Sequence, residues 1–275
     1  MTLRVFPPNR LLEPFVSAIW DYEDLLGGGN EGLSILPDTA TYLCFLYADR
    51  LTTAHKGRIY TTRSGLAGFQ SFRTDLGGFG KVSGVSARLT PWGLNVFCRG
   101  VVRDCSERRV DCRDLFPRYS IEQIEDELAM KETPRERVQC VERYLLALLD
   151  RDNEDRLIQA ACKALDRSAG NQPIAQLART LELTERTLER RFQAHIGATP
   201  KKYARIVRLR KAMLQGGRLG NWPDVACAAG YYDQSHMIRD FREFYGMSPE
   251  SIGPQLKKSP TLRYSGLMNL PQGGY

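Results

Sequence analysis

The sequence lacks several features that mark common classes of protein. Its 275 residues contain no run of about 18 apolar residues, which a membrane-spanning helix would need. The opening residues, MTLRVFPPNR, lack the apolar stretch of a secretory signal, so we expect a cytoplasmic protein with no membrane partner. The chain has only three His, no glycine-rich phosphate loop and no Cys-x-x-Cys pair. We therefore expect no metal, no cofactor and no enzymatic activity.

The seven cysteines are odd in number, which argues against a disulfide framework. Cys98, Cys105 and Cys112 recur every seven residues, a spacing that would suit a thiol or metal sensor. Because no histidines lie near them, we interpret them, and most of the other cysteines, as small buried hydrophobic residues.

Positive charge is confined to the second half of the chain. Residues 1–154 carry 20 Lys and Arg against 22 Asp and Glu, whereas residues 155–258 carry 18 against 10. A localised positive field favours a partner rich in phosphate.

The distribution of apolar residues predicts an α+β chain. Short apolar runs at residues 33–37, 41–47, 56–62 and 81–89 predict a β-rich N-terminal part. From residue 120 the period becomes helical, with a second helix beginning after Pro134. We predict a β-rich regulatory, effector-binding or dimerisation domain over residues 1–150, a linker near 150–155, an all-helical domain over 155–256 and a flexible tail over 257–275.

A repeat at an offset of 49 residues lies within the basic part. LTERTLERRFQAHIGATP at 183–200 matches GYYDQSHMIRDFREFYGMSP at 230–249, and each copy follows a short apolar helix, at 174–181 and 223–229. Each unit is therefore predicted to be a helix, a tight turn and a second helix. Residues 200–214 form a predicted spacer helix about 22 Å long.

The second helix of each unit has a donor-rich face. In the first unit Leu188, Phe192 and Ile196 form the apolar stripe, with Arg186 and Arg190 opposite it. Arginine can bond bidentately to guanine and glutamine to adenine, so these faces suit the reading of bases in the major groove.

These residues resemble the DNA-binding domain of AraC-type transcription regulators. The first unit and spacer match the family pattern at Thr184, Arg186, Leu188, Arg190, Phe192, Gly197, Pro200, Tyr203, Arg208, Leu209 and Ala212. The second unit matches it at Val225, Ala226, Gly230, Ser235, Arg239, Phe241, Gly246, Ser248 and Pro249.

The resemblance implies that the second helix of each unit enters a major groove. By position it assigns DNA reading to Arg186, Glu189, Arg190, Gln234, Ser235 and Arg239. The first turn has Glu182 where the second has Gly230, and His236 and Met237 replace the family's usual aromatic pair. Because a left-handed conformation is costly for glutamate, we expect a different turn in the first unit.

The N-terminal part resembles, at residues 11–20, 36–38 and 87–97, a domain often found before this module. The wider family implies a cupin-like β-barrel that binds an effector or forms a dimer. The partners implied are double-stranded promoter or operator DNA, RNA polymerase for an activator, a small-molecule effector and a second copy of the chain.

Two other functions compete with sequence-specific regulation. A methyl-accepting DNA-repair protein can carry the same module, but its zinc cysteines would be closely spaced, unlike those present here. A nonspecific nucleic-acid-binding or chromosome-compacting protein would need only positive charge. The repeated placement of Arg190 and Arg239 favours specific reading.

Overall fold

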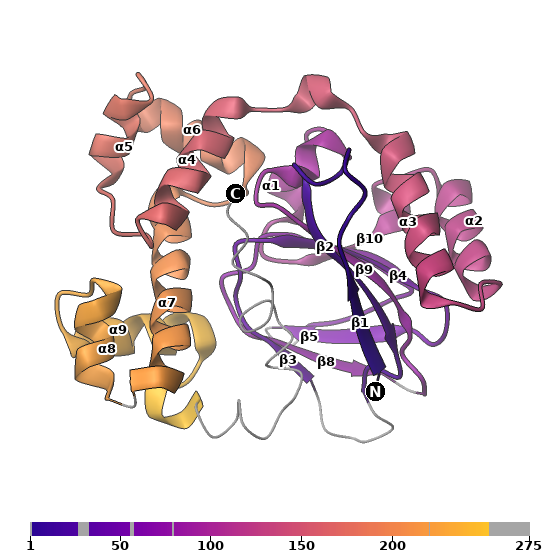
Figure 1. Ribbon diagram of the computed structural model, residues 1–275, viewed down its shortest axis with the longest axis horizontal. Helices are drawn as coiled ribbons and strands as arrows, with labels where there is room; N and C mark the ends of the chain where they lie inside the picture. The colour runs from indigo at the N-terminus through magenta and orange to yellow at the C-terminus, as the bar shows by residue number, and fades with distance from the viewer. Residues whose placement is uncertain (1, 27–32, 56–57, 79, 220, 253–275) are drawn as a thin grey trace.

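The computed structural model describes residues 2–26, 33–55, 58–78, 80–219 and 221–252. A β-rich N-terminal part lies beside a helical C-terminal part, as the sequence predicts (Figure 1). The predicted tail, residues 257–275, lies outside the described residues. None of the helices in the described ranges combines the length and the hydropathy that crossing a bilayer requires.

Two antiparallel sheets build the N-terminal part. One has the order β1-β2-β9-β4-β7-β10, with bounds Thr2–Phe6, Val16–Glu23, Gly84–Leu89, Thr41–Leu46, Ser64–Ala67 and Arg109–Asp111. The other has the order β3-β8-β5-β6, with bounds Leu33–Ile35, Thr74–Gly78, Leu51–His55 and Arg58–Thr62. Tyr22 and Leu46 of the first sheet pack with Leu51 and Leu76 of the second, so apolar burial joins the two sheets.

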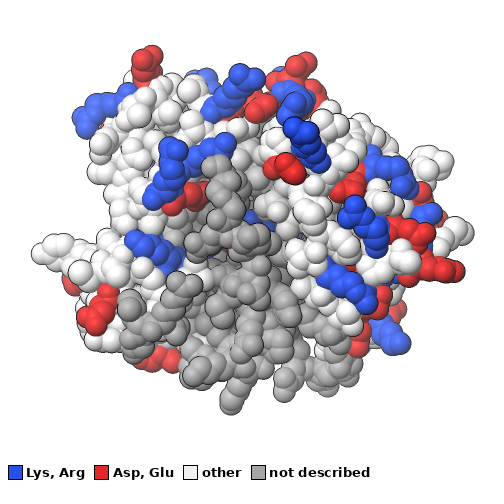
Figure 2. Space-filling model, in the orientation of Figure 1, with Lys and Arg blue, Asp and Glu red and all other residues white. Residues whose placement is uncertain are grey.

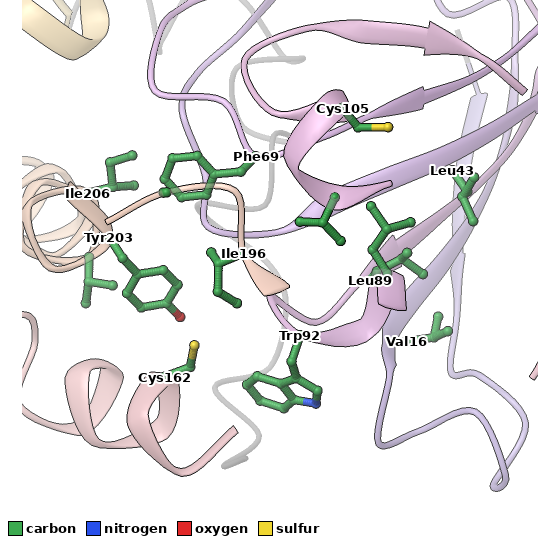
Figure 3. Close-up of a cluster of buried hydrophobic side chains, with 14 of the residues drawn as sticks. Val16, Leu43, Phe69, Leu89, Trp92, Cys105, Cys162, Ile196, Tyr203 and Ile206 are labelled. Carbon is green, nitrogen blue, oxygen red and sulfur yellow. The ribbon is translucent and has the colours of Figure 1, made fainter. Parts of the chain in front are cut away.

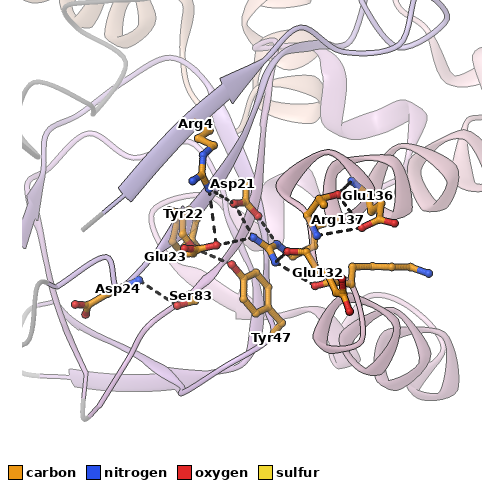
Figure 4. A network of polar contacts seen from close by, with 12 residues as sticks. Arg4, Asp21, Tyr22, Glu23, Asp24, Tyr47, Ser83, Glu132, Glu136 and Arg137 are labelled. Carbon is orange, nitrogen blue, oxygen red and sulfur yellow. Dashed lines mark hydrogen bonds and ion pairs between the residues drawn. The ribbon is translucent and has the colours of Figure 1, made fainter.

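Helices α2 (Arg118–Ala129) and α3 (Pro134–Leu148) cover the six-stranded sheet. Thr133 and Glu136 form a capping box at the start of α3. Farther along α3, the Arg137 guanidinium donates to Asp21 Oδ2 at 2.7 Å and to Glu23 Oε1 at 2.7 Å (Figure 4). This ion pair fastens α3 to strand β2.

The C-terminal part contains α4 (Arg156–Arg167), α5 (Ile174–Thr180), α6 (Glu185–His195), α7 (Pro200–Leu219), α8 (Trp222–Ala229) and α9 (Gln234–Asp240). A π-helical turn, η4 (Phe241–Tyr245), extends α9. The two predicted units are present as α5–α6 and α8–α9, and α7 joins them (Figure 1). At about 1.5 Å per residue, the 20 residues of α7 span about 30 Å, more than the sequence predicted.

One hydrophobic core crosses the junction between the two parts. Phe69, Leu89 and Trp92 of the N-terminal part belong to the same buried cluster as Ile196 and Tyr203 of the C-terminal part (Figure 3). Two short segments on the N-terminal side lie at the junction: η1 (Gly93–Val96), whose Asn95 contacts His195, and α1 (Val102–Cys105), which packs against α6. A third, η2 (Cys112–Asp114), packs against α2 and β7. The predicted linker includes a 3-10 turn, η3 (Arg151–Asn153), after which Asp155 caps α4.

Candidate nucleic-acid interface

The first unit makes its turn with a non-glycine residue in the left-handed region. Glu182 has φ 55°, and the next amide, that of Leu183, donates to the Ala178 carbonyl at 2.9 Å. Gly230 has φ 87° in the second unit, where the Tyr231 amide donates to Ala226 at 2.9 Å. Both units therefore end their first helix with a left-handed residue, and the expected difference between the turns lies in their length. The hydrogen bond that closes the helix outweighs a left-handed cost of about 1 kcal/mol.

The two turns differ in length, as a different turn in the first unit requires. In the first unit the helix cap, Thr184, stands two residues after Glu182. In the second unit the cap, Asp233, stands three residues after Gly230, so Tyr232 is an additional residue. Gly230 is also fixed by packing, because a Cβ there would lie 2.3 Å from Asn171 Oδ1.

Helix α6 has the two faces that its sequence predicts. Leu188, Phe192 and Ile196 are buried. The three predicted reading residues of this helix, Arg186, Glu189 and Arg190, are all exposed. Within the described ranges, none of these three side chains forms a hydrogen bond or ion pair, so all three are available to an external partner.

Helix α9 follows the same arrangement. Met237, Phe241 and Tyr245 are buried, whereas Ser235 and Arg239 are exposed and Gln234 is partly exposed. The polar atoms of the Gln234, Ser235 and Arg239 side chains have no partner among the residues that the structure describes. The structure thus places the six predicted residues in two exposed groups, one on the second helix of each unit.

Sequence reasoning missed an ion-pair latch that positions α9. Asp240 is 1% exposed and faces inward, and Arg205 of α7 donates to its Oδ1 through Nη2 at 2.6 Å. The Tyr231 hydroxyl donates to Asp240 Oδ2 at 3.2 Å, and Arg205 Nη2 also contacts Glu243 at 2.5 Å. The Arg205 guanidinium lies 4.5 Å from the centroid of the Phe244 ring. The second unit is thereby attached to the spacer at a fixed orientation.

The latch also affects the pKa values of its members. Burial acts to lower the pKa of Arg205, but hydrogen bonds to the carboxylates of Glu243 and Asp240 outweigh it, and the pKa rises. The hydrogen bond from Arg205 lowers the pKa of Glu243. Both charges therefore persist across the physiological pH range.

Helix α7 carries seven Lys or Arg and no acidic residue. Figure 2 shows basic and acidic side chains interspersed over the visible face of the molecule. Much of the charge on α7 is used internally. Lys202 pairs with Glu107 at 2.5 Å, Arg205 with Asp240, and Arg210 with Asp38 at 3.0 Å. Net charge alone therefore overstates the field available to an external phosphate.

Further polar contacts at the junction join the N-terminal part to the first unit and to α7. Asn95 Nδ2 lies 2.8 Å from His195 Nδ1, at the end of α6, and the Ser106 hydroxyl donates to the Gly197 carbonyl at 2.6 Å. Burial acts to raise the pKa of Asp38, but the charges of Arg88 and Arg210 outweigh it and hold that pKa well below its ordinary value. The junction is thus both apolar and ionic.

The cysteines fit the interpretation of buried hydrophobic residues, with two differences. Cys44, Cys105, Cys112, Cys140 and Cys162 are buried, but Cys98 is partly exposed and Cys227 is exposed. All seven are free thiols. Burial raises the pKa of Cys105 to about 11, which keeps that thiol protonated. Among the described residues, no three His, Cys, Asp or Glu side chains are grouped so as to hold a metal ion.

Comparison with known proteins supports the assignment of the two units. Residues 177–253 match the family model HTH_18, described as a helix-turn-helix domain. The uncharacterised HTH-type transcriptional regulator YidL of Escherichia coli is 29% identical over 92 residues, which cover 32% of this chain and 30% of that protein. The match thus spans less than a third of YidL.

Among solved structures, ToxT from Vibrio cholerae covers 92% of this chain and 98% of its own, with a TM-score of 0.46 and 9% identity. The AraC-like activator CuxR covers 81% of this chain and 91% of its own, with a TM-score of 0.26 and 13% identity. Likenesses this distant carry no argument about the chemistry of this chain.

The class that the paired units, the spacer and the family match define is the double helix-turn-helix domain. Residues 177–253 of this chain therefore contain a helix-turn-helix domain, which agrees with the resemblance of its sequence to AraC-type regulators.

Proposed function

We propose that the protein is a sequence-specific DNA-binding transcription regulator whose helices α6 and α9 read two successive major grooves. One observation carries the proposal. Arg190 and Arg239, 49 residues apart, occupy equivalent positions on the two helices, and both are exposed and without an internal partner in the described chain. Two unpaired arginines at matching positions do not stabilise the fold. They can, however, each bond to the acceptors on a guanine edge.

The spacer suits this arrangement. Successive major grooves on one face of DNA are about 34 Å apart, and α7 spans about 30 Å. The latch between Arg205 and Asp240 would fix α9 near one end of the two-unit domain, while α6 is fixed at the opposite end of the spacer α7. A single chain would then contact both grooves.

We further propose that the six predicted reading residues divide the reading between the units. Arg186, Glu189 and Arg190 would contact one groove, and Gln234, Ser235 and Arg239 the next. The N-terminal part, joined to α6 and α7 through the junction, would modulate this binding. The predicted partners are RNA polymerase, a small-molecule effector and a second copy of the chain. The division of the chain into domains at residues 150–155 also stays a prediction.

The test uses a duplex that the purified full-length protein selects from random-sequence DNA. Arg190→Ala and Arg239→Ala should each weaken binding to that duplex by about 1–3 kcal/mol and relax base choice at a few adjacent positions. Lys201→Ala, which removes an exposed cation at the start of α7, should weaken selected and random duplexes alike. Arg118→Ala, on α2 with a side chain 77% exposed, is the control and should change neither affinity.

The competing functions predict other results. A nonspecific binder would bind both duplexes equally at moderate salt, and the arginine variants would then change only the salt dependence. A methyl-accepting repair protein would bind zinc stoichiometrically, which a metal assay of the purified protein would detect.

A further inference from the structure

Tyr232 exposes an aromatic ring to an unusual degree. It is 94% exposed, more than any other large hydrophobic residue in the described chain. The others that are exposed, Val5, Leu11, Ile59, Tyr119 and Met130, all lie in the N-terminal part. The adjacent Tyr231 is 5% exposed, and its hydroxyl donates to Asp240. The fold therefore buries one tyrosine of the pair and leaves the other without a described hydrogen-bonding partner.

The position of Tyr232 determines what its ring can meet. It is the additional residue in the second turn, directly before Asp233, whose side chain accepts from the His236 amide at 2.7 Å and caps α9. Gln234 and Ser235 follow at once. In helix-turn-helix proteins the first residues of the reading helix contact base edges. A residue just before them therefore lies at the rim of the groove, beside the sugar-phosphate backbone.

The charge of the second unit makes a neutral donor valuable there. Residues 222–252 contain two basic residues, Arg239 and Arg242, against five acidic ones, a formal charge of −3. Residues 174–199, which form the first unit, contain four basic and three acidic residues, a formal charge of +1. The second unit thus has few cations with which to hold a phosphate. Tyrosine hydroxyls are among the uncharged groups that bond to phosphate oxygens.

We propose that the Tyr232 hydroxyl donates a hydrogen bond to a DNA phosphate at the edge of the groove that α9 enters. The inference rests on the proposed function and adds a phosphate contact from a turn residue that has no counterpart in the shorter turn of the first unit. This contact fixes the register of α9 and carries no base preference.

The test compares Tyr232→Phe with wild type in the full-length protein. The variant keeps the ring and loses only the hydroxyl. We expect it to bind the selected duplex and a random duplex about two- to tenfold more weakly, by the same factor for each. Because a neutral donor releases no counterion, the slope of log K against log salt should not change, whereas Lys201→Ala should reduce it by about one. Tyr119→Phe, whose ring is 76% exposed on α2, is the matched control and should bind as wild type.

A second measurement locates the contact on the DNA. Uncharged methylphosphonate is placed at one backbone position at a time across the selected duplex. At one position beside the second groove, the substitution should weaken binding by wild type more than the loss of one phosphate charge alone does. Binding by Tyr232→Phe should show no such additional loss at that position.

Three results would overturn the inference while leaving the proposed function intact. Tyr232→Phe could bind both duplexes as wild type does. It could lose discrimination between them, which would indicate a base contact. It could bind DNA normally yet fail to regulate transcription, which would indicate a protein partner. A wild-type protein that does not discriminate between the duplexes would overturn the proposed function, and the inference with it.

Discussion

Replacing Arg205 with methionine tests how the second unit is held on the spacer. The change keeps an apolar stem against Phe244. Among the described residues it leaves the Asp240 carboxylate, which is 1% exposed, with only the Tyr231 hydroxyl as a hydrogen-bonding partner. Removing one member of a buried ion pair costs about 3–5 kcal/mol. Arg205 is itself 27% exposed in its side chain, so we expect about 3 kcal/mol, the lower end of that range.

The second ion pair of Arg205 adds little to this figure. Glu243 has a side chain that is 54% exposed, and such exposed pairs contribute about 0–1 kcal/mol. Most of the cost of Arg205→Met should therefore come from the unpaired charge of Asp240. In an Asp240→Asn background, Arg205→Met should cost about 1 kcal/mol or less, which gives a coupling energy of about 2 kcal/mol.

Urea unfolding followed by far-UV circular dichroism measures the free energy of unfolding of all four members of this cycle. Binding to the selected duplex is measured in parallel, and Arg205→Met should weaken it because the reading face of α9 is no longer fixed. If Arg205→Met cost the same in both backgrounds, the latch would have no coupling energy and the reasoning would be refuted.

Three further predictions concern stability. Burial raises the pKa of Asp166 to about 6, so between about pH 4 and 6 the folded chain holds a proton that the unfolded chain releases. The free energy of unfolding should therefore fall by up to about 3 kcal/mol as pH rises from about 4 to 6. Asp166→Asn should remove that part of the pH dependence, and an unchanged dependence would contradict the assignment. Gly197 has φ 78°, and a Cβ there would lie 2.8 Å from Ser106 Cβ, so Gly197→Ala should destabilise the fold by about 1–3 kcal/mol. Gly246 has φ 71° but open space around it, so Gly246→Ala should cost less. Equal costs in thermal unfolding would argue against packing at the junction. Glu182→Gly should stabilise the first unit by up to about 1 kcal/mol, because glycine adopts its left-handed conformation freely; a loss of stability would show that the glutamate side chain has a structural role.

The sequence predicts the helical half of the fold well, because its signals are local. The cap at Thr184, the proline at the start of α7 and the 49-residue repeat each specify an element within a few residues. The strands are harder to predict. Strands β3, β4, β6 and β9 fall within the predicted apolar runs, whereas β2 is not predicted. Strand β2 is buried or partly buried at every position, so it shows no alternation, and α3 covers it on one side. Burial on both faces removes the period on which sequence reasoning depends.

The candidate site likewise has a part that the sequence predicts and a part that it does not. The faces of α6 and α9 follow from helical periodicity, and the structure exposes Arg190 and Arg239 as that periodicity predicts. The latch joins Arg205 to Asp240 across 35 residues, and no local pattern relates the two. The charge used within α7 is equally hidden, because pairing depends on tertiary contacts with Glu107 and other acidic side chains.

The most direct test of the account measures the affinity of wild type, Arg190→Ala and Arg239→Ala for the selected duplex and for random duplexes at one moderate salt concentration. We expect wild type to bind the selected duplex at least about a thousandfold more tightly than random DNA. Each arginine variant should reduce that ratio by about five- to 150-fold, with the lost preference falling in a different groove for each variant. A wild-type ratio near one, or arginine variants that keep the full ratio, would contradict the central claim that α6 and α9 read sequence.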